Sequence, residues 1–334
     1  MAFPTETVYG LGANALSGVA VRRIYEAKRR SPDDPCIVHL ADAGELGGVA
    51  VLPTGTMLAG RVAALAAAFW PGPLSLILPR GDAVPLVVTA GRESVAVRVP
   101  AHPIAMALLR AAAVPIAAPS ANLFMHTSPT TAGHVLRDLG GRIELILDGG
   151  PTRMGVESTV LDLTGEVPAV LRPGGISLSQ LRAVLGLVVA GARDDRDSGS
   201  AAARDAGMPA PGMLATHYAP NAEVILLDGP TEAVRAALIE RAGALIGRGI
   251  PVGALLPDQD LAALLTAAPE LIGAALGPHD DLEAIARRLY AGMRELEDRG
   301  AAVILCRSIS GEGVGEAIAD RLGRAAGGRI IHVG

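Results

Sequence analysis

The sequence predicts an α/β fold in two domains that a linker joins. Its 334 residues correspond to about two domains of roughly 100 to 200 residues each. Short β-like runs alternate with helical segments in both parts of the chain. Between these parts, residues 190–215 are rich in Asp, Gly, Ser and Pro and show no apolar period. We therefore place the domains at residues 1–187 and 221–334, with a flexible linker at 188–220.

The first domain is expected to be an open twisted sheet covered by helices. Apolar runs predict strands at residues 36–40, 74–78, 94–99, 114–118, 144–148 and 158–163. The Ala-, Leu- and Arg-rich stretches between these runs have the 3.6-residue period of helices. One such helical run includes residues 24–30, IYEAKRR, and is expected to end there because Pro32 and Pro35 follow it.

The second, smaller domain shows the alternation of a Rossmann-like parallel sheet. Its predicted strands lie at residues 222–229, 250–256, 270–276, 301–306 and 329–333. Helical stretches such as 281–300 separate them, as in doubly wound α/β domains. The first strand ends in Asp228-Gly229-Pro230 rather than in GxGxxG, so the pattern does not predict dinucleotide binding.

Composition excludes several classes of protein. The net charge of −5 and the pI near 5.8 lack the basic excess of a protein that binds nucleic acid tightly. Cys36 and Cys306 stand alone, without the spacing of a zinc site or a disulfide framework. The first ten residues do not resemble a signal peptide, and no long apolar stretch predicts a membrane span. These features predict a cytoplasmic protein.

Lys28 is the only lysine of the chain, because 28 of its 29 basic residues are arginine. It is not preceded by the glycine of GxxxxGK[ST], which excludes a P-loop. A cation at a helix end is ordinarily a solvated partner of the helix dipole. Where nearly all other basic residues are arginine, a retained lysine instead more often lies at a site that needs a compact ammonium. Both interpretations stay open on these grounds.

Polar residues gather in loops and at the ends of predicted strands. The loop at residues 4–12, PTETVYGLG, offers hydroxyl and backbone N–H groups that could hold a small polar ligand, although a turn with threonine caps explains it equally well. Further candidates lie next to Pro or Gly or at strand ends: Ser94, Arg98, Ser120, Asn122, Ser128, Ser158, Thr159 and Arg172. No HExxH or other metal-ligand spacing and no GxSxG elbow occurs.

Eight ordered motifs carry a resemblance. They are PTETVYGLG, the K-x-R of Lys28 and Arg30, SVAVRVPAHP, APSAN, TSPTTA, ESTVLDL, LRPGG and the linker motif HYAP. In this order they resemble the two-domain YrdC-type L-threonylcarbamoyladenylate synthases. The resemblance covers essentially the whole chain and implies a YrdC-like first domain. That family usually has a helix and the start of a strand before PTETVYG, so an N-terminal piece is expected to be missing here.

The resemblance implies ATP-dependent synthesis of L-threonylcarbamoyladenylate from L-threonine and bicarbonate or CO2, with release of pyrophosphate. It further implies that the product serves threonylcarbamoyladenosine modification of tRNA through downstream transfer proteins. Mg²⁺ would arrive with ATP rather than occupy a protein cage. Carboxylate attack at phosphorus brings two anions together, so the site needs fixed cations.

The family's functional residues carry over to positions of this chain. Lys28 and Arg30 would be the catalytic cations. The threonine side would comprise Thr7, His39, Arg98, the backbone around Ala118, and Ser158. The ATP side would comprise Arg30, Asp34, Ser94, Ser120, Asn122, Ser128, Arg172 and Tyr218. Tyr218 belongs to HYAP, which the resemblance makes a lid over the nucleotide.

One departure concerns the nucleotide side. The chain reads K-R-R-S-P-D-D-P where the family commonly has K-G-R-P-x-x-N-P, so Asp34 replaces an asparagine. A carboxylate near triphosphate is unfavourable unless neutralised, and we expect Arg29 to pair with Asp33 or Asp34. Two alternative functions are a YrdC-like carbamoyltransferase and a non-catalytic RNA-binding regulatory module. The two isolated cysteines disfavour the first, and the acidic pI disfavours the second.

Overall fold

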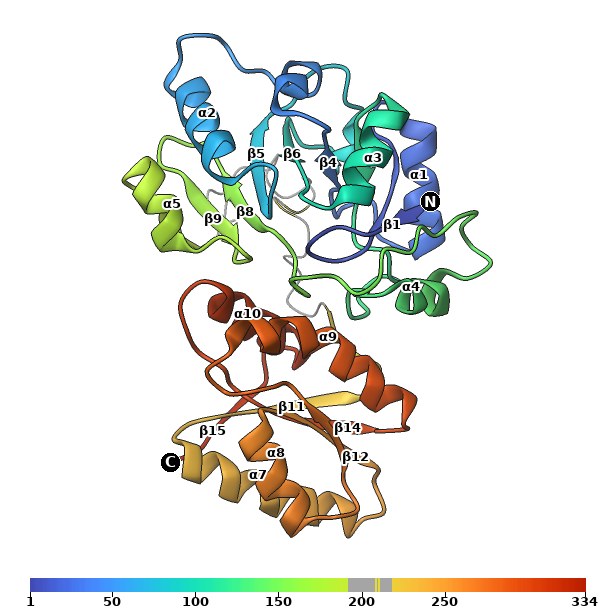
Figure 1. Cartoon of the computed structure of the whole chain (residues 1–334), viewed down its shortest axis with the longest axis vertical. Coiled ribbons are helices and arrows are strands. Elements are labelled where there is room, and N and C mark those ends of the chain that lie inside the picture. The colour runs from blue at the N-terminus through green and yellow to red at the C-terminus, as the bar shows by residue number, and fades with distance from the viewer. Residues whose placement is uncertain (192–207, 209, 211–217) are drawn as a thin grey trace. The chain divides into compact units, whose positions relative to one another are not determined.

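The structure is a computed structural model that describes residues 1–191, 208, 210 and 218–334, and it divides into two compact units (Figure 1). The first unit comprises Met1–Phe124, Thr131–Arg153 and Glu157–Met213. The second comprises Leu214–Gly334 together with two short segments from the first half of the chain, Met125–Thr130 and Met154–Val156. Most of the predicted linker lies outside the described residues.

The first unit is built on an eight-stranded sheet of mixed direction. In spatial order its strands are β10 (Val189–Ala190), β9 (Ala169–Arg172), β8 (Thr159–Asp162), β5 (Leu74–Pro79), β6 (Ser94–Arg98), β4 (Ile37–His39), β7 (Ile116–Ala118) and β3 (Ala13–Asn14). β4 runs parallel to β6, whereas β5 and β7 run antiparallel to their partners β6 and β4. A separate antiparallel pair joins β1 (Ala2–Phe3) to β2 (Gly10–Leu11).

Helices accompany this sheet (Figure 1). They are α1 (Gly18–Lys28), α2 (Met57–Phe69), α3 (Pro103–Ala112), α4 (Ala132–Leu139) and α5 (Leu178–Leu185), with short 3-10 helices at Ala43–Gly48 and Leu86–Val88. Helix α1 begins because Ser17 accepts a hydrogen bond from the Ala20 N–H. It ends at Lys28, where Arg29 takes the left-handed conformation with φ 52°.

The main core and the buried polar residues His39 and Arg98 lie on opposite faces of the sheet. Val38, Leu76 and Val97 pack in the main core together with apolar residues of α2 and α5. Because side chains alternate along a strand, the neighbours of these three residues face the other way and form a second cluster, which includes Ile37 and Ala96. His39 and Arg98 follow those two residues by two positions, so they share this second face.

Five of the six strands predicted for the first domain are confirmed, as β4, β5, β6, β7 and β8. The strand predicted at residues 144–148 is wrong: Ile146 forms a single bridge with Ala2, because β1 is too short to pair with more of it. Strand β9 was not predicted. Its four residues lead directly into the turn indicated by the Pro-Gly sequence after Arg172, so the segment was interpreted as part of that turn.

The second unit is a five-stranded parallel sheet, as predicted. Its spatial order is β13 (Ile272–Ala275), β12 (Val252–Leu256), β14 (Val303–Arg307), β11 (Glu223–Asp228) and β15 (Ile330–His332). Helices α7 (Thr231–Ile246) and α8 (Asp258–Ala267) cover one face, and α9 (Leu282–Asp298) and α10 (Val314–Ala325) cover the other (Figure 1). Among the described residues, no helix is both long and apolar enough to cross a membrane.

Candidate active site

Arg98 is the centre of a buried polar cluster in the first unit. It ends β6, where it lies in register with His39 of β4. Its guanidinium donates to the Thr7 hydroxyl at 3.0 Å and to the Gly72 carbonyl at 3.1 Å, and it forms an ion pair with Glu6 at 2.5 Å. The loop of residues 4–12 thus meets the end of β6, and two predicted threonine-side residues, Thr7 and Arg98, are in direct contact.

Glu6 is a functional candidate that sequence reasoning missed. The side chains of Glu6 and Arg98 are only 3% and 4% exposed. Burial raises the pKa of Glu6, but the charge of Arg98 outweighs it, so the pKa of Glu6 lies below its ordinary value. Hydrogen bonds from the Arg98 side chain and from the backbone at Glu6 and Ala101 lower the pKa of Glu6 further. The signal in the sequence was the glutamate between the two threonines of PTETVYGLG.

Replacing Glu6 with Gln is expected to lower the free energy of unfolding of the first unit by about 3–5 kcal/mol at neutral pH, because it leaves Arg98 buried without its counter-charge. The pKa of Glu6 lies below 4.5 in the folded chain. The pair therefore stabilises the fold above that pH, and this stabilisation is lost as the pH falls through the lowered pKa. The deficit of the variant should accordingly shrink in acid.

Trp70, the single tryptophan, belongs to the first unit, so its fluorescence during denaturant unfolding measures this effect. Glu93→Gln is the matched control, because Glu93 pairs with Arg80 at 2.7 Å but is 78% exposed. Loss of that surface pair should cost at most about 1 kcal/mol. A deficit of Glu6→Gln that stays constant from neutral to acid pH would contradict the ion-pair assignment.

His39 is neutral in its buried site next to Arg98. Burial and the Arg98 charge lower the pKa of His39 to about 3. Its Nδ1 lies 3.1 Å from the Ile37 carbonyl oxygen, which can only accept, so Nδ1 donates in this contact. Ala118 of β7 pairs with Ile37 and contributes to the same region of the sheet through its backbone.

Ser158, which directly precedes β8, and Arg172, which ends β9, form a second buried group. The Arg172 guanidinium donates to the Ser158 carbonyl at 3.0 Å and to its hydroxyl at 3.2 Å. The Ser158 hydroxyl also lies 2.8 Å from that of Ser75 on β5. The structure therefore brings together a predicted threonine-side residue, Ser158, and a predicted ATP-side residue, Arg172.

Lys28 lies in the interior rather than on a solvated helix end. It is 1% exposed, and its Nζ donates to the carbonyl oxygens of Ser120 and Asn122, each at 2.5 Å. Burial and then the nearby Arg30 charge lower the pKa of Lys28 well below its ordinary value. The lysine thereby holds the APSAN loop, which starts at the last residue of β7, against the end of α1. A compact amine can donate hydrogen bonds to two nearby carbonyls in this way.

Arg30 neutralises Asp34, which corrects the expectation for Arg29. Arg30 Nη2 lies 2.9 Å from Asp34 Oδ1, with both side chains buried, and the same guanidinium donates to the Pro35 carbonyl at 2.7 Å. Arg29 is exposed, and no ion pair joins it to Asp33 or Asp34 within the described part of the chain. The left-handed backbone of Arg29 ends the helix and leaves the next residue, Arg30, to turn inward.

The remaining predicted residues occupy different places. Ser94 begins β6 opposite Pro79 and is half-buried. Ser128 and Tyr218 are buried and belong to the second unit. His217 of the HYAP motif lies outside the described residues. The structure thus assigns twelve of the predicted residues to the first unit and two to the second, and their roles stay predictions.

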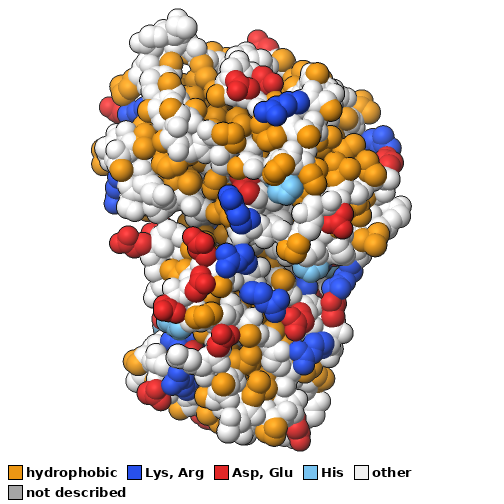
Figure 2. Space-filling view, in the orientation of Figure 1, with side chains coloured by type: hydrophobic (Ala, Val, Ile, Leu, Met, Phe, Trp, Pro, Cys, Tyr) orange, Lys and Arg blue, Asp and Glu red, His pale blue; other side chains and the backbone are white. Residues whose placement is uncertain are grey.

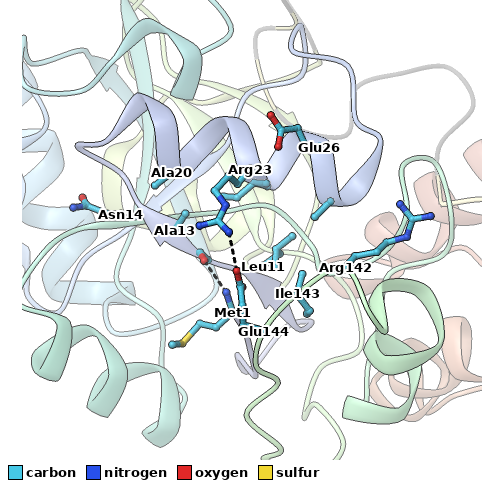
Figure 3. A pocket seen from close by; sticks show the side chains of 13 residues that line it. Met1, Leu11, Ala13, Asn14, Ala20, Arg23, Glu26, Arg142, Ile143 and Glu144 are labelled. Carbon is cyan, nitrogen blue, oxygen red and sulfur yellow. Dashed lines mark hydrogen bonds and ion pairs between the residues drawn. The ribbon is translucent and has the colours of Figure 1, made fainter.

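A separate pocket of about 390 Å³ in the first unit is lined by the end of the candidate loop, Leu11 and Gly12, but by none of the residues predicted to bind threonine or ATP (Figure 3). It lies between α1 and residues 142–144 and is lined by Arg23, Glu26, Arg142 and Glu144, among others. Arg23 and Glu144 pair at 3.0 Å, but both side chains are more than two-thirds exposed. Such a pair contributes little binding or stability, so we do not place chemistry there.

Family models match the chain in two parts. Residues 1–174 match the Sua5_yciO_yrdC family, described as "Telomere recombination". Residues 176–327 match the family described as "Threonylcarbamoyl-AMP synthase, C-terminal domain". The two matched ranges together span nearly the whole chain.

Similar proteins and structures agree with these matches. The chain is 44% identical to the threonylcarbamoyl-AMP synthase of Pyrococcus abyssi, covering 100% of this chain and 92% of that protein. It is 43% identical to the threonylcarbamoyl-AMP synthase of Bacillus subtilis, covering 99% and 90%. The crystal structure of P. abyssi Sua5 complexed with L-threonine matches with a TM-score of 0.87 at 43% identity, over 100% of this chain and 92% of that chain. The chain therefore belongs to the threonylcarbamoyl-AMP synthase family, in its two-domain form.

Proposed function

We propose that this chain condenses L-threonine, bicarbonate or CO2, and ATP into L-threonylcarbamoyladenylate and pyrophosphate. The observation that carries the proposal is the buried Glu6–Arg98 pair, which places one carboxylate beside one guanidinium at the end of β6. One anion beside one cation complements the zwitterion of an amino acid. The complex of the P. abyssi relative with L-threonine and the names of the similar proteins support the same substrate.

On the threonine side, Arg98 would bind the substrate carboxylate and Glu6 its ammonium. A guanidinium has five N–H groups. Arg98 directs one to Gly72, one to Thr7 and one to Glu6, so two are left to bind a carboxylate. Neutral His39 would line the site without adding charge. The hydroxyls of Thr7 and Ser158 would complete the set of groups that orient the substrate.

On the nucleotide side, the threonine ammonium first loses a proton to solvent, and the free amine then adds to the carbon of CO2 and loses a second proton to give N-carboxythreonine, a carbamate. The carboxylate of this carbamate attacks the α-phosphorus of ATP. A bond forms between that oxygen and the phosphorus, the bond from the α-phosphorus to the bridging oxygen breaks, and pyrophosphate leaves. Negative charge accumulates on the phosphate oxygens, where Lys28 and Arg30 would stabilise it. Arrival of the triphosphate would raise the pKa of Lys28 and favour its ammonium form.

ATP would enter as its Mg²⁺ complex. The donor set fits this arrangement, because the carboxylate next to the proposed cations, Asp34, is already paired with Arg30. In the described residues, no group of three or more acidic, histidine or cysteine side chains could hold a metal ion. Triphosphate oxygens and water would therefore supply the ligands of the ion.

Replacing Asp34 with Asn is expected to lower the KM for ATP severalfold, because Arg30 then keeps its full charge for the triphosphate. Steady-state pyrophosphate release at varied ATP measures the effect. Asp33→Asn is the control, since Asp33 is exposed and its carboxylate accepts from the Ser31 hydroxyl at 3.0 Å. A KM for ATP that Asp34→Asn leaves unaltered would show that this carboxylate does not act on the nucleotide.

Pyrophosphate release from the purified chain tests the proposal. Release should require ATP, bicarbonate and L-threonine together, and L-serine or glycine should replace threonine poorly. Release without threonine, or equal release with carbamoyl phosphate alone, would favour the carbamoyltransferase alternative. The net charge of −5 and the interspersed charges on the face that Figure 2 draws give the RNA-binding alternative no support.

The product would be passed to other proteins. A mixed anhydride of a carbamate and a phosphate hydrolyses readily, so a transfer step must follow its formation closely. We propose that downstream transfer proteins use it for threonylcarbamoyladenosine modification of tRNA, and that this chain itself holds no tRNA tightly. A cytoplasmic location likewise stays a prediction from the cysteine pattern.

A further inference from the structure

Tyr9 is buried in the first unit, and its hydroxyl group is bonded to the turn at residues 148–150, which we call the brace. The hydroxyl donates to the Gly150 carbonyl at 2.7 Å and accepts from the Gly149 N–H at 3.1 Å. Burial raises the pKa of this hydroxyl, so it keeps the proton that it donates. Asp148 closes the turn, because its Oδ1 accepts from the Gly150 N–H at 2.9 Å.

The brace also touches the loop of residues 4–12 near its other end. A Cβ on Gly149 would lie 2.7 Å from Pro4 Cγ and 3.0 Å from His102 Cε1. A larger residue at this position would have to displace Pro4 or His102, so glycine permits the close approach. The brace therefore contacts the loop at two points, Pro4 and Tyr9.

The chain just before the brace is fixed to the N-terminal strand β1. The Ala2 N–H donates to the Leu145 carbonyl at 2.8 Å, and the Leu147 N–H donates to the Ala2 carbonyl at 2.9 Å. These two bonds flank the bridge between Ala2 and Ile146. The stretch predicted as a strand at residues 144–148 thus leads into the brace and holds it in place.

The functional candidates of the loop lie between the two contact points. Glu6 and Thr7 both reach Arg98. Thr5 closes this part of the loop, because its hydroxyl donates to the Val8 carbonyl at 2.6 Å and accepts from the Thr7 N–H at 3.2 Å. A shift at either end of so closed a loop is passed on to Glu6 and Thr7.

Tyr9 is held in place by more than its hydroxyl group. Its carbonyl accepts from the Ala121 N–H of the APSAN loop at 2.8 Å. Its ring packs in an apolar cluster with Leu11, Ala121 and Val135. Removal of the hydroxyl alone is therefore expected to release the brace while the ring and the backbone stay where they are.

We propose that Tyr9 is a positioning residue for threonine binding, and that it acts by holding the loop of Glu6 and Thr7 against the brace. The proposal rests on the proposed function. Arg98 presents its guanidinium from the end of a strand, whereas Glu6 and Thr7 belong to a loop. The placement of these two side chains relative to Arg98 depends on the contacts that support the loop. Tyr9 is not a catalytic residue, because its hydroxyl bonds the brace rather than the substrate.

Tyr9→Phe in the full-length chain tests the proposal, because it removes the hydroxyl and keeps the ring. The KM for L-threonine should rise about five- to tenfold, as expected for the loss of hydrogen bonds to a buried hydroxyl, while the KM for ATP stays unchanged. Steady-state pyrophosphate release measures both values. Tyr25→Phe is the matched control and should leave the KM for threonine unchanged. Tyr25 is a buried tyrosine of α1 whose hydroxyl lies 3.0 Å from the Val87 carbonyl and 3.2 Å from the Asp34 carbonyl.

Gly149→Ala tests the same contact from the side of the brace, and it keeps the proposal testable if Tyr9→Phe does not fold. The added methyl group should push Pro4 away and raise the KM for threonine in the same way. Gly47→Ala is its control, since a Cβ on Gly47 would meet nothing within 4 Å.

Two further measurements separate positioning from a general loss of stability. Tyr9→Phe and Tyr25→Phe should lower the free energy of unfolding by similar amounts, followed by Trp70 fluorescence, yet only Tyr9→Phe should raise the KM for threonine. Hydrogen exchange at the Gly149 N–H should accelerate in Tyr9→Phe, because that variant lacks its acceptor.

A wild-type KM for threonine in both Tyr9→Phe and Gly149→Ala would overturn the positioning role, and so would equal increases in the KM values for threonine and ATP. If the wild-type chain releases no pyrophosphate with threonine, the proposed function fails instead. In that case, exchange at the Gly149 N–H of Tyr9→Phe that is as slow as in the wild type would separately overturn the brace.

Discussion

Replacing Lys28 with Arg is expected to lower kcat by about a hundredfold or more while the chain stays folded, the size of effect seen when a donor to developing charge is lost. The Nζ of Lys28 serves the Ser120 and Asn122 carbonyls from a site that is 1% exposed. A guanidinium is larger and planar, so it cannot occupy this site without moving the APSAN loop. It also spreads its charge over three nitrogens.

Pyrophosphate release measures kcat, and the unfolding of the first unit followed by Trp70 fluorescence shows whether the fold is kept. Arg22→Lys is the control, because Arg22 is an exposed residue on the same helix. Near-normal turnover of Lys28→Arg would make the single lysine an accident of composition. Loss of the folded first unit would assign Lys28 a structural role only.

Replacing Arg98 with Lys is expected to raise the KM for threonine by about tenfold to a hundredfold, which corresponds to one or two hydrogen bonds between charged groups. Three nitrogens of Arg98 reach Gly72, Thr7 and Glu6, and a single ammonium cannot reach all three and also hold a carboxylate in a bidentate pair. The KM for ATP should change little.

The measurement is steady-state pyrophosphate release at varied L-threonine, with Arg110→Lys on the exposed side of α3 as control. A KM for threonine within twofold of the wild-type value would remove Arg98 from the threonine site. A KM for ATP raised instead would move it to the nucleotide side.

Most of the architecture could be predicted from local pattern. Strands such as β5 and β12 are short, mainly apolar runs, and both were predicted. The prolines after residue 30 predicted that α1 ends before them, and the helix ends two residues earlier, at Lys28, because Arg29 is left-handed. The stretch around Ile146 has the same apolar character but gains a single bridge, because pairing depends on a neighbour from elsewhere in the chain. Strand direction in the mixed sheet of the first unit depends on such long-range pairing too.

The candidate site could be predicted only as residue types in loops. The pairing of Arg30 with Asp34, rather than of Arg29, depends on a left-handed residue at the helix end that spacing does not reveal. The ion pair of Glu6 with Arg98 joins residues 92 positions apart, and no local signal connects them. The inclusion of Ser128 in the second unit is likewise a property of tertiary packing.

The identity of the product tests the central claim most directly. The purified chain is incubated with ATP, L-threonine and carbon-13-labelled bicarbonate. The nucleotides are then separated, and their masses are measured by mass spectrometry. The account predicts an AMP derivative that contains threonine and one labelled carbon, formed in equal amount to pyrophosphate. Formation of an unlabelled threonine–AMP ester, or of pyrophosphate without any threonine-containing nucleotide, would contradict it.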